Sequence, residues 1–301
     1  MQDKGITLAF LGCGNMGRAL LVGLLDALGQ SDTNKTTPLV SRFILCTKTE
    51  ASAQSLHKEL PSSSFLVDIF HANNKAAVEQ ADVVILGFKP FMATEVLQAP
   101  GMRQALEGKL IISMLAGMDC QQIGDIITAG NGEAPPIARA IPNIAARYRQ
   151  SITILEQTEP PLSSKHATMV ERIFGLVGNV KWLPAHLVNL GTVLTTACLA
   201  TLSIPLDGLL DGSVVQGLRR QDALELVAHG VAGLSSLLSN GAHPALMRES
   251  ISSPRGCTIQ TLMTVEKAGA RASFAQALID GVQHLDSLKS KEESKQYTAS
   301  V

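Results

Sequence analysis

The sequence has 301 residues, of which 46% are hydrophobic and 17% charged, and its formal net charge at pH 7 is −1. This composition excludes a chain that is disordered throughout, and the charge excludes the strongly basic surface by which proteins bind nucleic acid or anionic membranes. The five cysteines form no Cys-x-x-Cys pair and the N-terminus lacks the pattern of a secretory signal, so we expect a cytoplasmic protein without a zinc site or disulfide framework.

The first half of the chain alternates apolar runs with segments whose leucines recur at helical spacing. The apolar runs predict strands at 6–11, 42–47, 82–88 and 109–115. The intervening segments predict a surface loop at 30–38 and helices at 16–29 and 51–60. Such alternation is typical of right-handed βαβ crossovers, so we predict an α/β domain with a Rossmann-type parallel sheet.

The pattern changes from residue 137 onward. A helix at 163–176 is flanked by two short runs that could extend the sheet, at 151–155 and 179–183. After Pro184 the pattern is helical to the end, and the polar residues 286–301 predict a frayed tail. We therefore expect two domains, a nucleotide-binding domain at 1–183 and an all-α domain at 184–301.

One stretch without charged residues, between His186 and Asp207, is about as long as a membrane span. Polar residues and Pro205 interrupt it, and no basic cluster flanks it. We expect a buried helix at a subunit or domain interface rather than a membrane helix.

Residues 12–17 read Gly-Cys-Gly-Asn-Met-Gly and lie between the first predicted strand and helix. Glycines also mark ordinary turns, but this context is the one that a dinucleotide-binding loop requires. Gly12 would permit the tight turn, Gly14 the close approach of the pyrophosphate, and Gly17 the packing of helix on strand. The helix N-terminus would offer free N–H groups to the phosphates. We predict a cofactor site that includes Gly12, Gly14, Asn15, Met16 and Gly17.

The end of the second predicted strand distinguishes the two nicotinamide cofactors. NAD sites usually carry a carboxylate there, whereas this sequence reads Cys-Thr-Lys-Thr at 46–49. The cation of Lys48 and the hydroxyl of Thr47 suit a 2′-phosphate, so we predict NADPH. Glu50 lies close enough to keep NADH open, and Lys48 could instead be a solvated loop residue.

Several segments, in order along the chain, resemble the pyrroline-5-carboxylate reductase family. They are 12–17, Asn74–Val78, Phe88–Pro90, Arg139–Asn143, Gly217–Leu218 with Ala223–Leu226, and Ser253–Ile259. The glycine loop alone would not distinguish this family. The combination of Arg-x-x-Pro-Asn with the late Ser-Pro-x-Gly-x-Thr-Ile segment does.

This resemblance implies a Rossmann domain followed by an all-α dimerisation domain, in a homodimer or a higher homo-oligomer. The implied reaction is hydride transfer from NAD(P)H to the cyclic imine carbon of pyrroline-5-carboxylate, which gives proline. It requires no metal, because a protonated imine is already electrophilic, and the protein supplies mainly positioning.

The resemblance also implies roles for the late segment. The hydroxyl of Thr258 would hydrogen-bond the ring nitrogen, and Ser253 with the Gly256-Cys257-Thr258 backbone would hold the substrate carboxylate. The residues themselves agree, because Pro254 and Gly256 predict a tight turn before a helix, which is a good anion site. The alternative is that Ser253 only caps that helix and Thr258 packs.

Other positions match the cofactor side of the family. They are Asn74, Lys89, Pro90, Ala116, Gly117 and Asn143. For Asn143 an equally acceptable interpretation is an asparagine that fixes the turn after Pro142.

The sequence departs from the family pattern at three places. Thr195–Thr201 replaces a small-residue segment with bulkier side chains, Arg255 replaces a glycine, and Ile144-Ala145 replaces Thr-Pro. If position 255 needs a positive φ, an arginine there is strained by about 1 kcal/mol or more. Otherwise its guanidinium could bind a second acid group, so a substituted pyrroline carboxylate is a candidate substrate.

Two further hypotheses remain. A β-hydroxyacid dehydrogenase would carry a catalytic lysine after a glycine motif, and Gly175-x-x-Gly178 with Lys181 is a faint match. A catalytically silent NADPH-binding protein would explain the altered 195–201 segment, but the retained Ser253 and Thr258 argue against it.

Overall fold

The computed structural model describes residues 5–30, 38–60 and 66–299, with the side chains of the last helix described up to Ser287. The chain forms two compact units, each described on its own. Unit 1 contains the described parts of 1–192 and 284–301, and unit 2 contains 193–283. The helical half of the chain begins at Ala185, next to the expected domain division, whereas the compact units part inside the helix that starts there.

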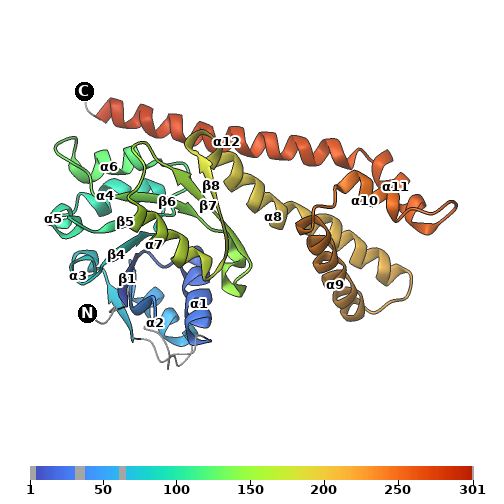
Figure 1. Cartoon of the computed structure of the whole chain (residues 1–301), viewed down its shortest axis with the longest axis horizontal. Coiled ribbons are helices and arrows are strands. Elements are labelled where there is room, and N and C mark those ends of the chain that lie inside the picture. Colours follow the sequence, from blue (N-terminus) through green and yellow to red (C-terminus); the bar gives the residue numbers. More distant parts are fainter. Residues whose placement is uncertain (1–4, 31–37, 61–65, 300–301) are drawn as a thin grey trace. The chain divides into compact units, whose positions relative to one another are not determined.

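Unit 1 is built on an eight-stranded sheet with the strand order β3-β2-β1-β4-β5-β6-β7-β8 (Figure 1). Every neighbouring pair is parallel except β6 and β7. The strands are β1 Ile6–Leu11, β2 Val40–Thr47, β3 Leu66–His71, β4 Val83–Leu86, β5 Leu110–Ser113, β6 Ile137–Ile141, β7 Ser151–Gln157 and β8 Gly178–Pro184. The predicted Rossmann-type sheet is confirmed, and the two late strands do extend it.

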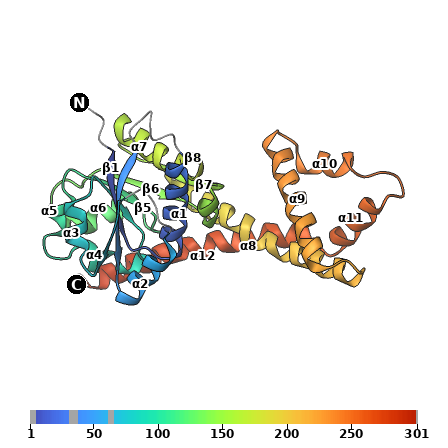
Figure 2. The ribbon, with the colours of Figure 1, turned by 90° about the horizontal axis from the view of Figure 1, so that it is seen from below.

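Helices cover both faces of this sheet (Figure 2). One core lies under α1, α2 and α7, and the other lies under α3 to α6. The elements of this layer are α1 Asn15–Gly29, α2 Glu50–Glu59, α3 Asn74–Glu79, η1 Pro90–Met92, α4 Ala93–Leu97, α5 Met102–Leu106, α6 Cys120–Thr128, η2 Ile144–Tyr148 and α7 Ser164–Gly175. Because the central strands are buried on both faces, they read as continuous apolar runs, and the sequence located them correctly.

Two strands have no clear signal in the sequence. β3 lies at the edge of the sheet, is only partly buried, and carries Asp68, which forms an ion pair with Arg42 of β2 at 2.7 Å. β6 is buried but has Arg139 at its centre, which interrupts its apolar run. Residues 31–37 of the expected 30–38 loop lie outside the described residues.

The second half of the chain is helical, as expected. Its helices are α8 Ala185–Val215, α9 Arg220–Ser239, α10 Pro244–Ser250, α11 Cys257–Lys267 and α12 Ala270–Ala299. The expectation of a frayed tail from residue 286 is wrong for the described residues, because α12 continues through Ala299.

The helix α8 carries apolar side chains that the single chain leaves exposed. The only buried residues of α8 are Val188 and Gly191. Its exposed apolar side chains include Leu194, Leu199, Leu202, Ile204 and Leu209. Among the described residues, α8 alone has the length and apolarity of a membrane span. An exposed apolar surface of this kind marks a place where another surface packs.

The helix α1 packs tightly against η2 through Gly23. A Cβ atom at Gly23 would collide with the carbonyl oxygen of Ala146 and lie 3.1 Å from Val177. Gly29, at the far end of the same helix, has no atom within 4 Å of such a position. The two glycines therefore share a helix and differ in packing.

We predict that Gly23→Ala destabilises the protein by about 1–3 kcal/mol, because the added methyl group must displace η2. The matched control Gly29→Ala should be neutral or gain up to about 1 kcal/mol from helix propensity. Urea unfolding followed by circular dichroism measures both changes. Equal effects of the two substitutions would contradict the assigned packing.

Candidate functional site

The loop after β1 is held close to two neighbouring strands. The Gly12 N–H donates to the carbonyl oxygen of Cys46 in β2 at 3.1 Å. The φ angle of Gly12 is +86°, and a Cβ atom there would lie 2.8 Å from the Phe88 nitrogen. Any other residue at position 12 would thus be both strained and in collision with backbone.

The start of α1 is open to a ligand. Gly14 is the exposed N-cap residue, and a Cβ atom on it would meet nothing within 4 Å. No side chain caps the helix, so the first-turn N–H groups that follow, from Asn15 to Gly17, are available to an anion. Gly17 is buried, and its Cβ position lies 3.2 Å from the Gly12 carbonyl oxygen, so it permits the return of the helix over the strand.

Gly87, at the end of β4, is a residue that the sequence analysis missed. Its N–H donates to the carbonyl oxygen of Leu11 at 2.9 Å, and a Cβ atom on it would lie 2.5 Å from the carbonyl oxygen of Gly12. The loops after β1 and β4 therefore touch through backbone alone. Lys89, exposed, and Pro90, the first residue of η1, follow directly.

Arg18 lies next to the glycine loop but is used within the protein. Its guanidinium donates to Ser55 Oγ at 3.0 Å and forms an ion pair with Glu59. The hydrogen bond from Arg18 holds the pKa of the Glu59 carboxyl below its ordinary value. This link joins α1 to α2, so Arg18 is not left for the phosphates.

The end of β2 presents one exposed cation. Lys48 is exposed and makes an ion pair with the exposed Glu95 at 3.6 Å, which solvent screens. Thr47 is buried, and its hydroxyl donates to the Thr49 carbonyl oxygen at 3.1 Å. The Thr49 hydroxyl accepts from the Ser52 N–H and caps α2. Of the two predicted residues, Lys48 is thus the more accessible.

Asn74 lies at the start of α3, but its neighbour is the cap. The Asn73 side chain accepts from the Ala76 N–H at 3.3 Å. The side chain of Asn74 is half-buried and makes no hydrogen bond within the described part of the chain. Asn74 can therefore bind a ligand without giving up a structural contact.

The remaining cofactor-side positions follow β5 and β6. Gly117 has a φ angle of +82° in the loop after β5, next to the exposed Ala116. Asn143 is buried, its Oδ1 accepts from the Ala145 N–H at 3.1 Å, and its own N–H donates to Ser151 Oγ. The Asn143 oxygen therefore fixes the turn into η2, which is the structural interpretation left open above.

The Ser253–Thr258 turn belongs to unit 2 and joins α10 to α11. The Gly256 N–H donates to the Ser253 carbonyl oxygen at 3.0 Å, and a Cβ on Gly256 would lie 2.5 Å from Ser253 Oγ. Gly256 is the N-cap residue of α11, and no side chain caps this helix. Ser253 thus does not cap α11, and Cys257 and Thr258 occupy its uncapped first turn.

Arg255 occupies the left-handed region, with a φ angle of +61°, and its side chain is exposed. Position 255 therefore does need a positive φ, and arginine there costs about 1 kcal/mol relative to glycine. The strained backbone at position 255 thus carries an exposed guanidinium at the turn.

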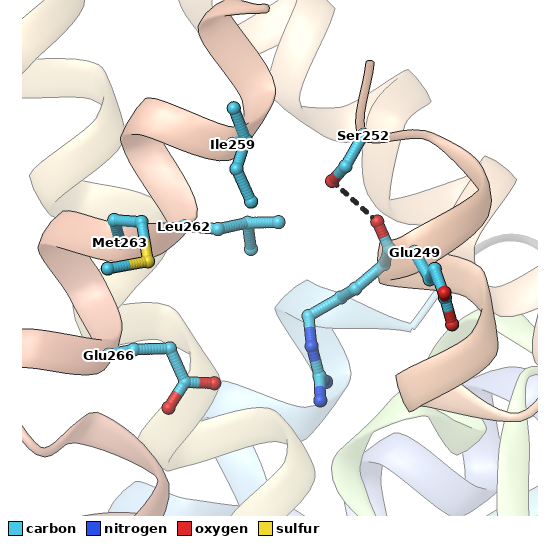
Figure 3. A pocket seen from close by; sticks show the side chains of 7 residues that line it. Glu249, Ser252, Ile259, Leu262, Met263 and Glu266 are labelled. Atoms are coloured by element: carbon cyan, nitrogen blue, oxygen red, sulfur yellow. Dashed lines mark hydrogen bonds between the residues drawn. The ribbon is translucent and has the colours of Figure 1, made fainter. Parts of the chain in front are cut away.

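A separate cavity of about 330 Å³ lies in unit 2 between α10 and α11 (Figure 3). Ile259, Leu262 and Met263 form its apolar wall, and Arg248, Glu249 and Glu266 carry its charges. Ser252 Oγ, at its edge, donates to the Arg248 carbonyl oxygen at 2.6 Å. None of the predicted substrate residues lines this cavity, so it is distinct from the turn that the sequence singled out.

Of the two glycines near Lys181, Gly178 has a packing explanation. A Cβ on Gly178 would collide with the carbonyl oxygen of Ser151, which lies beside it in β7. Lys181 is exposed on β8, the strand at the edge of the sheet. Strand pairing therefore accounts for Gly178 of the faint dehydrogenase motif, whereas a Cβ on Gly175 would meet nothing within 4 Å.

The thiols near the glycine loop are buried. Burial raises the pKa of Cys13 and of Cys46 to about 12, so both stay neutral at ordinary pH and are poor nucleophiles or metal ligands. Across the described ranges, no group of three or more His, Cys, Asp or Glu side chains is placed to hold a metal ion.

Two family models match the chain. Residues 185–288 match a model described as pyrroline-5-carboxylate reductase dimerisation, and residues 7–117 match one described as NADP oxidoreductase, coenzyme F420-dependent. The first match supports homo-oligomerisation. Among solved structures, a Plasmodium falciparum pyrroline carboxylate reductase with NADP bound is similar, with a TM-score of 0.78 at 20% identity over 96% of this chain and 99% of that one. At this identity the likeness shows the fold.

Curated relatives match over nearly the whole length. A pyrroline-5-carboxylate reductase from Lophium arboricola is 36% identical over 92% of this chain and 91% of its own. One from Neurospora crassa is 33% identical over the same shares. The chain belongs to the pyrroline-5-carboxylate reductase family.

Proposed function

We propose that this protein reduces the C=N bond of pyrroline-5-carboxylate with NADPH and releases proline. The observation that carries the proposal is the uncapped start of α1, with open space at Gly14, at the carboxyl end of β1. Such a start suits a pyrophosphate. The relatives named as pyrroline-5-carboxylate reductases identify the reaction class.

The cofactor would be held along the carboxyl ends of the parallel strands. Gly14, Asn15, Met16 and Gly17 would bind the pyrophosphate, with Gly12 shaping the turn, while Lys48 and Thr47 would receive the 2′-phosphate. Asn74, Lys89, Pro90, Ala116, Gly117 and Asn143 would complete the site, Asn143 through the turn that it fixes. When bound, NADPH supplies the hydride for the imine carbon.

The substrate would be held by the Ser253–Thr258 turn. Ser253 and the N–H groups of the first turn of α11 would hold the carboxylate, since an uncapped helix start favours an anion. The Thr258 hydroxyl would hydrogen-bond the ring nitrogen and orient the imine. Although position 255 has a positive φ, the Arg255 side chain is exposed and would lie beside the carboxylate, so we retain a ring-substituted pyrroline carboxylate as the alternative substrate.

The assembly and domain roles complete the proposal. Residues 1–183 would bind NADPH, and residues 184–301 would form the dimerisation and substrate domain of a homodimer or higher homo-oligomer. The exposed apolar side chains of α8 support burial against a second copy. All five cysteines are free, which supports a reducing compartment, the cytoplasm.

The reaction is tested by following NADPH oxidation over a panel of cyclic imines. We expect turnover of pyrroline-5-carboxylate and a kcat/KM at least about 100-fold lower for pyrroline without its carboxylate, because the turn would lose its anionic partner. If the guanidinium binds a second acid group, Arg255→Gly would lower kcat/KM for acid-substituted rings relative to that for the plain ring. NADPH binding without oxidation of any imine would contradict the proposal and favour a silent binding protein.

Cofactor choice is tested by Lys48→Asp. A carboxylate in place of the ammonium repels the 2′-phosphate, so the ratio of kcat/KM for NADPH to that for NADH should fall at least about 10-fold. Glu95→Gln is the matched control, because it removes the partner of Lys48 but keeps the cation, and it should preserve NADPH preference. An unaltered ratio in Lys48→Asp would remove Lys48 from the site.

The role of Thr258 is tested by Thr258→Ala. Loss of one hydrogen bond to a partly charged group should lower kcat/KM for the imine about 10- to 100-fold, while the Kd for NADPH is retained. Thr258→Ser should recover much of the rate, because it keeps a hydroxyl. Thr261→Ala, on the same helix, is the control and should be close to wild type. Unchanged turnover in Thr258→Ala would refute the role.

A further inference from the structure

A buried ion pair lies at the centre of the second half of the sheet. Arg139 Nη1 in β6 and Glu156 Oε2 in β7 are 3.1 Å apart, and their side chains are 4% and 5% exposed. Charges at this depth are retained only when paired, and removal of one partner is strongly destabilising. The pair therefore fixes the position of any group bonded to it.

The pair is connected to the two helices that begin and end the helical half of the chain. Arg139 Nη2 donates to Asn189 Oδ1 in α8 at 2.8 Å, and Asn189 Nδ2 donates to Asp286 Oδ1 in α12 at 2.9 Å. All four residues belong to unit 1. The middle of α12 is thus attached to the sheet through polar side chains.

The residues of this ion pair lie near both ends of the segment that follows β5. Arg139 pairs in register with Ser113, the last residue of β5. Cys120 is the first residue of α6; burial, with a smaller contribution from the negative charge of Glu156, raises its pKa to about 12, so the thiol keeps its proton. Residues 114–119 therefore start and finish beside the Arg139–Glu156 pair.

The middle of that segment is supported by α12. Leu285 Cδ1 lies 3.7 Å from the position that a Cβ of Gly117 would take, which is ordinary van der Waals contact. Leu285 directly precedes Asp286, the residue that Asn189 holds. A shift of Asp286 would accordingly move the side chain that backs Gly117.

The strand order indicates which part of the cofactor would contact residues 114–119. Lys48 follows β2, the pyrophosphate loop follows β1, and the sheet continues through β4 to β5. A dinucleotide laid across the ends of these strands, with its 2′-phosphate at β2, places its nicotinamide toward β4 and β5. The Ala116–Gly117 segment would therefore lie on the nicotinamide side.

We propose that Asn189 and Asp286 are positioning residues: they hold α12 so that Leu285 supports the Ala116–Gly117 segment against the nicotinamide half of the cofactor. This role rests on the proposed function. The Asn189–Asp286 hydrogen bond is exposed, so its loss contributes little to global stability. Its effect should appear in the binding of one half of the cofactor.

The test compares two ligands on the full chain by calorimetric titration. Asp286→Ala should raise the Kd for NADPH about 3- to 10-fold, the range expected for one hydrogen bond. The Kd for 2′,5′-ADP, which carries only the adenosine end, should stay unchanged. Asp286→Asn should behave as wild type, because its side-chain oxygen still accepts from Asn189.

Two further variants complete the test. Asp280→Ala is the control on the same helix, since within the described residues Asp280 accepts only from Gln276 one turn away, and it should alter neither Kd. Leu285→Ala should reproduce the split between the ligands, and its effect should not add to that of Asp286→Ala if both act on Gly117.

Three outcomes would overturn the role. They are equal weakening of both ligands, no weakening of NADPH in either variant, and full additivity of Leu285→Ala with Asp286→Ala. A wild-type protein that binds 2′,5′-ADP and NADPH but reduces no imine would refute the proposed reaction and leave the positioning role to be judged by the Kd values. A wild-type protein that binds neither ligand would overturn both proposals.

Discussion

The nucleotide-binding edge of unit 1 depends on the close approach of two backbones, at Gly12 and Gly87. Each glycine occupies a position where a Cβ atom would collide with the other's loop. Their contact brings the end of β1 against the end of β4, the point from which the strand order runs outward in both directions. Ligands of such sheets bind at this point, because the loops on its two sides diverge. A Cβ atom would fit freely at Gly14, whereas Gly12 and Gly87 leave no room for one.

A second constraint lies in the other half of the sheet. The antiparallel pair of β6 and β7 brings Arg139 and Glu156 together, and each charge is acceptable at this depth only because of the other. Arg139 also lies beside the end of β5 and is hydrogen-bonded to Asn189 near the start of α8, which in turn bonds Asp286 in the middle of α12. One electrostatic requirement thereby connects elements that are far apart in the sequence.

The helical half of the chain has a different character. Its helices bury few side chains within a single copy and expose many leucines, which is expected of a surface completed by another molecule. The match to a dimerisation model over 185–288 identifies that molecule as a second copy of the chain. Packing between copies would cover apolar side chains that a single copy leaves exposed.

The candidate sites follow this division of labour. The cofactor-side residues lie on the rigid sheet of unit 1, where backbone contacts determine their positions. The Ser253–Thr258 turn, which we propose as the substrate site, lies in unit 2, at the uncapped start of α11, with Arg255 in a strained conformation that an unconstrained arginine would avoid. The strain at this turn is consistent with a binding role for the Arg255 guanidinium.

The sequence by itself determined the central strands, the glycine loop, the helical second half and the family, because apolar periodicity and short backbone motifs are local properties. It did not predict β3, because an edge strand is half polar. It did not predict β6, because Arg139 interrupts the apolar run, and its buried position is explained only by its ion pair with Glu156. The tertiary structure alone decided that Gly87 contacts Gly12, that Asn143 caps a turn, and that α12 returns to Gly117. Each of these depends on a neighbour distant in the chain, and no local pattern records it.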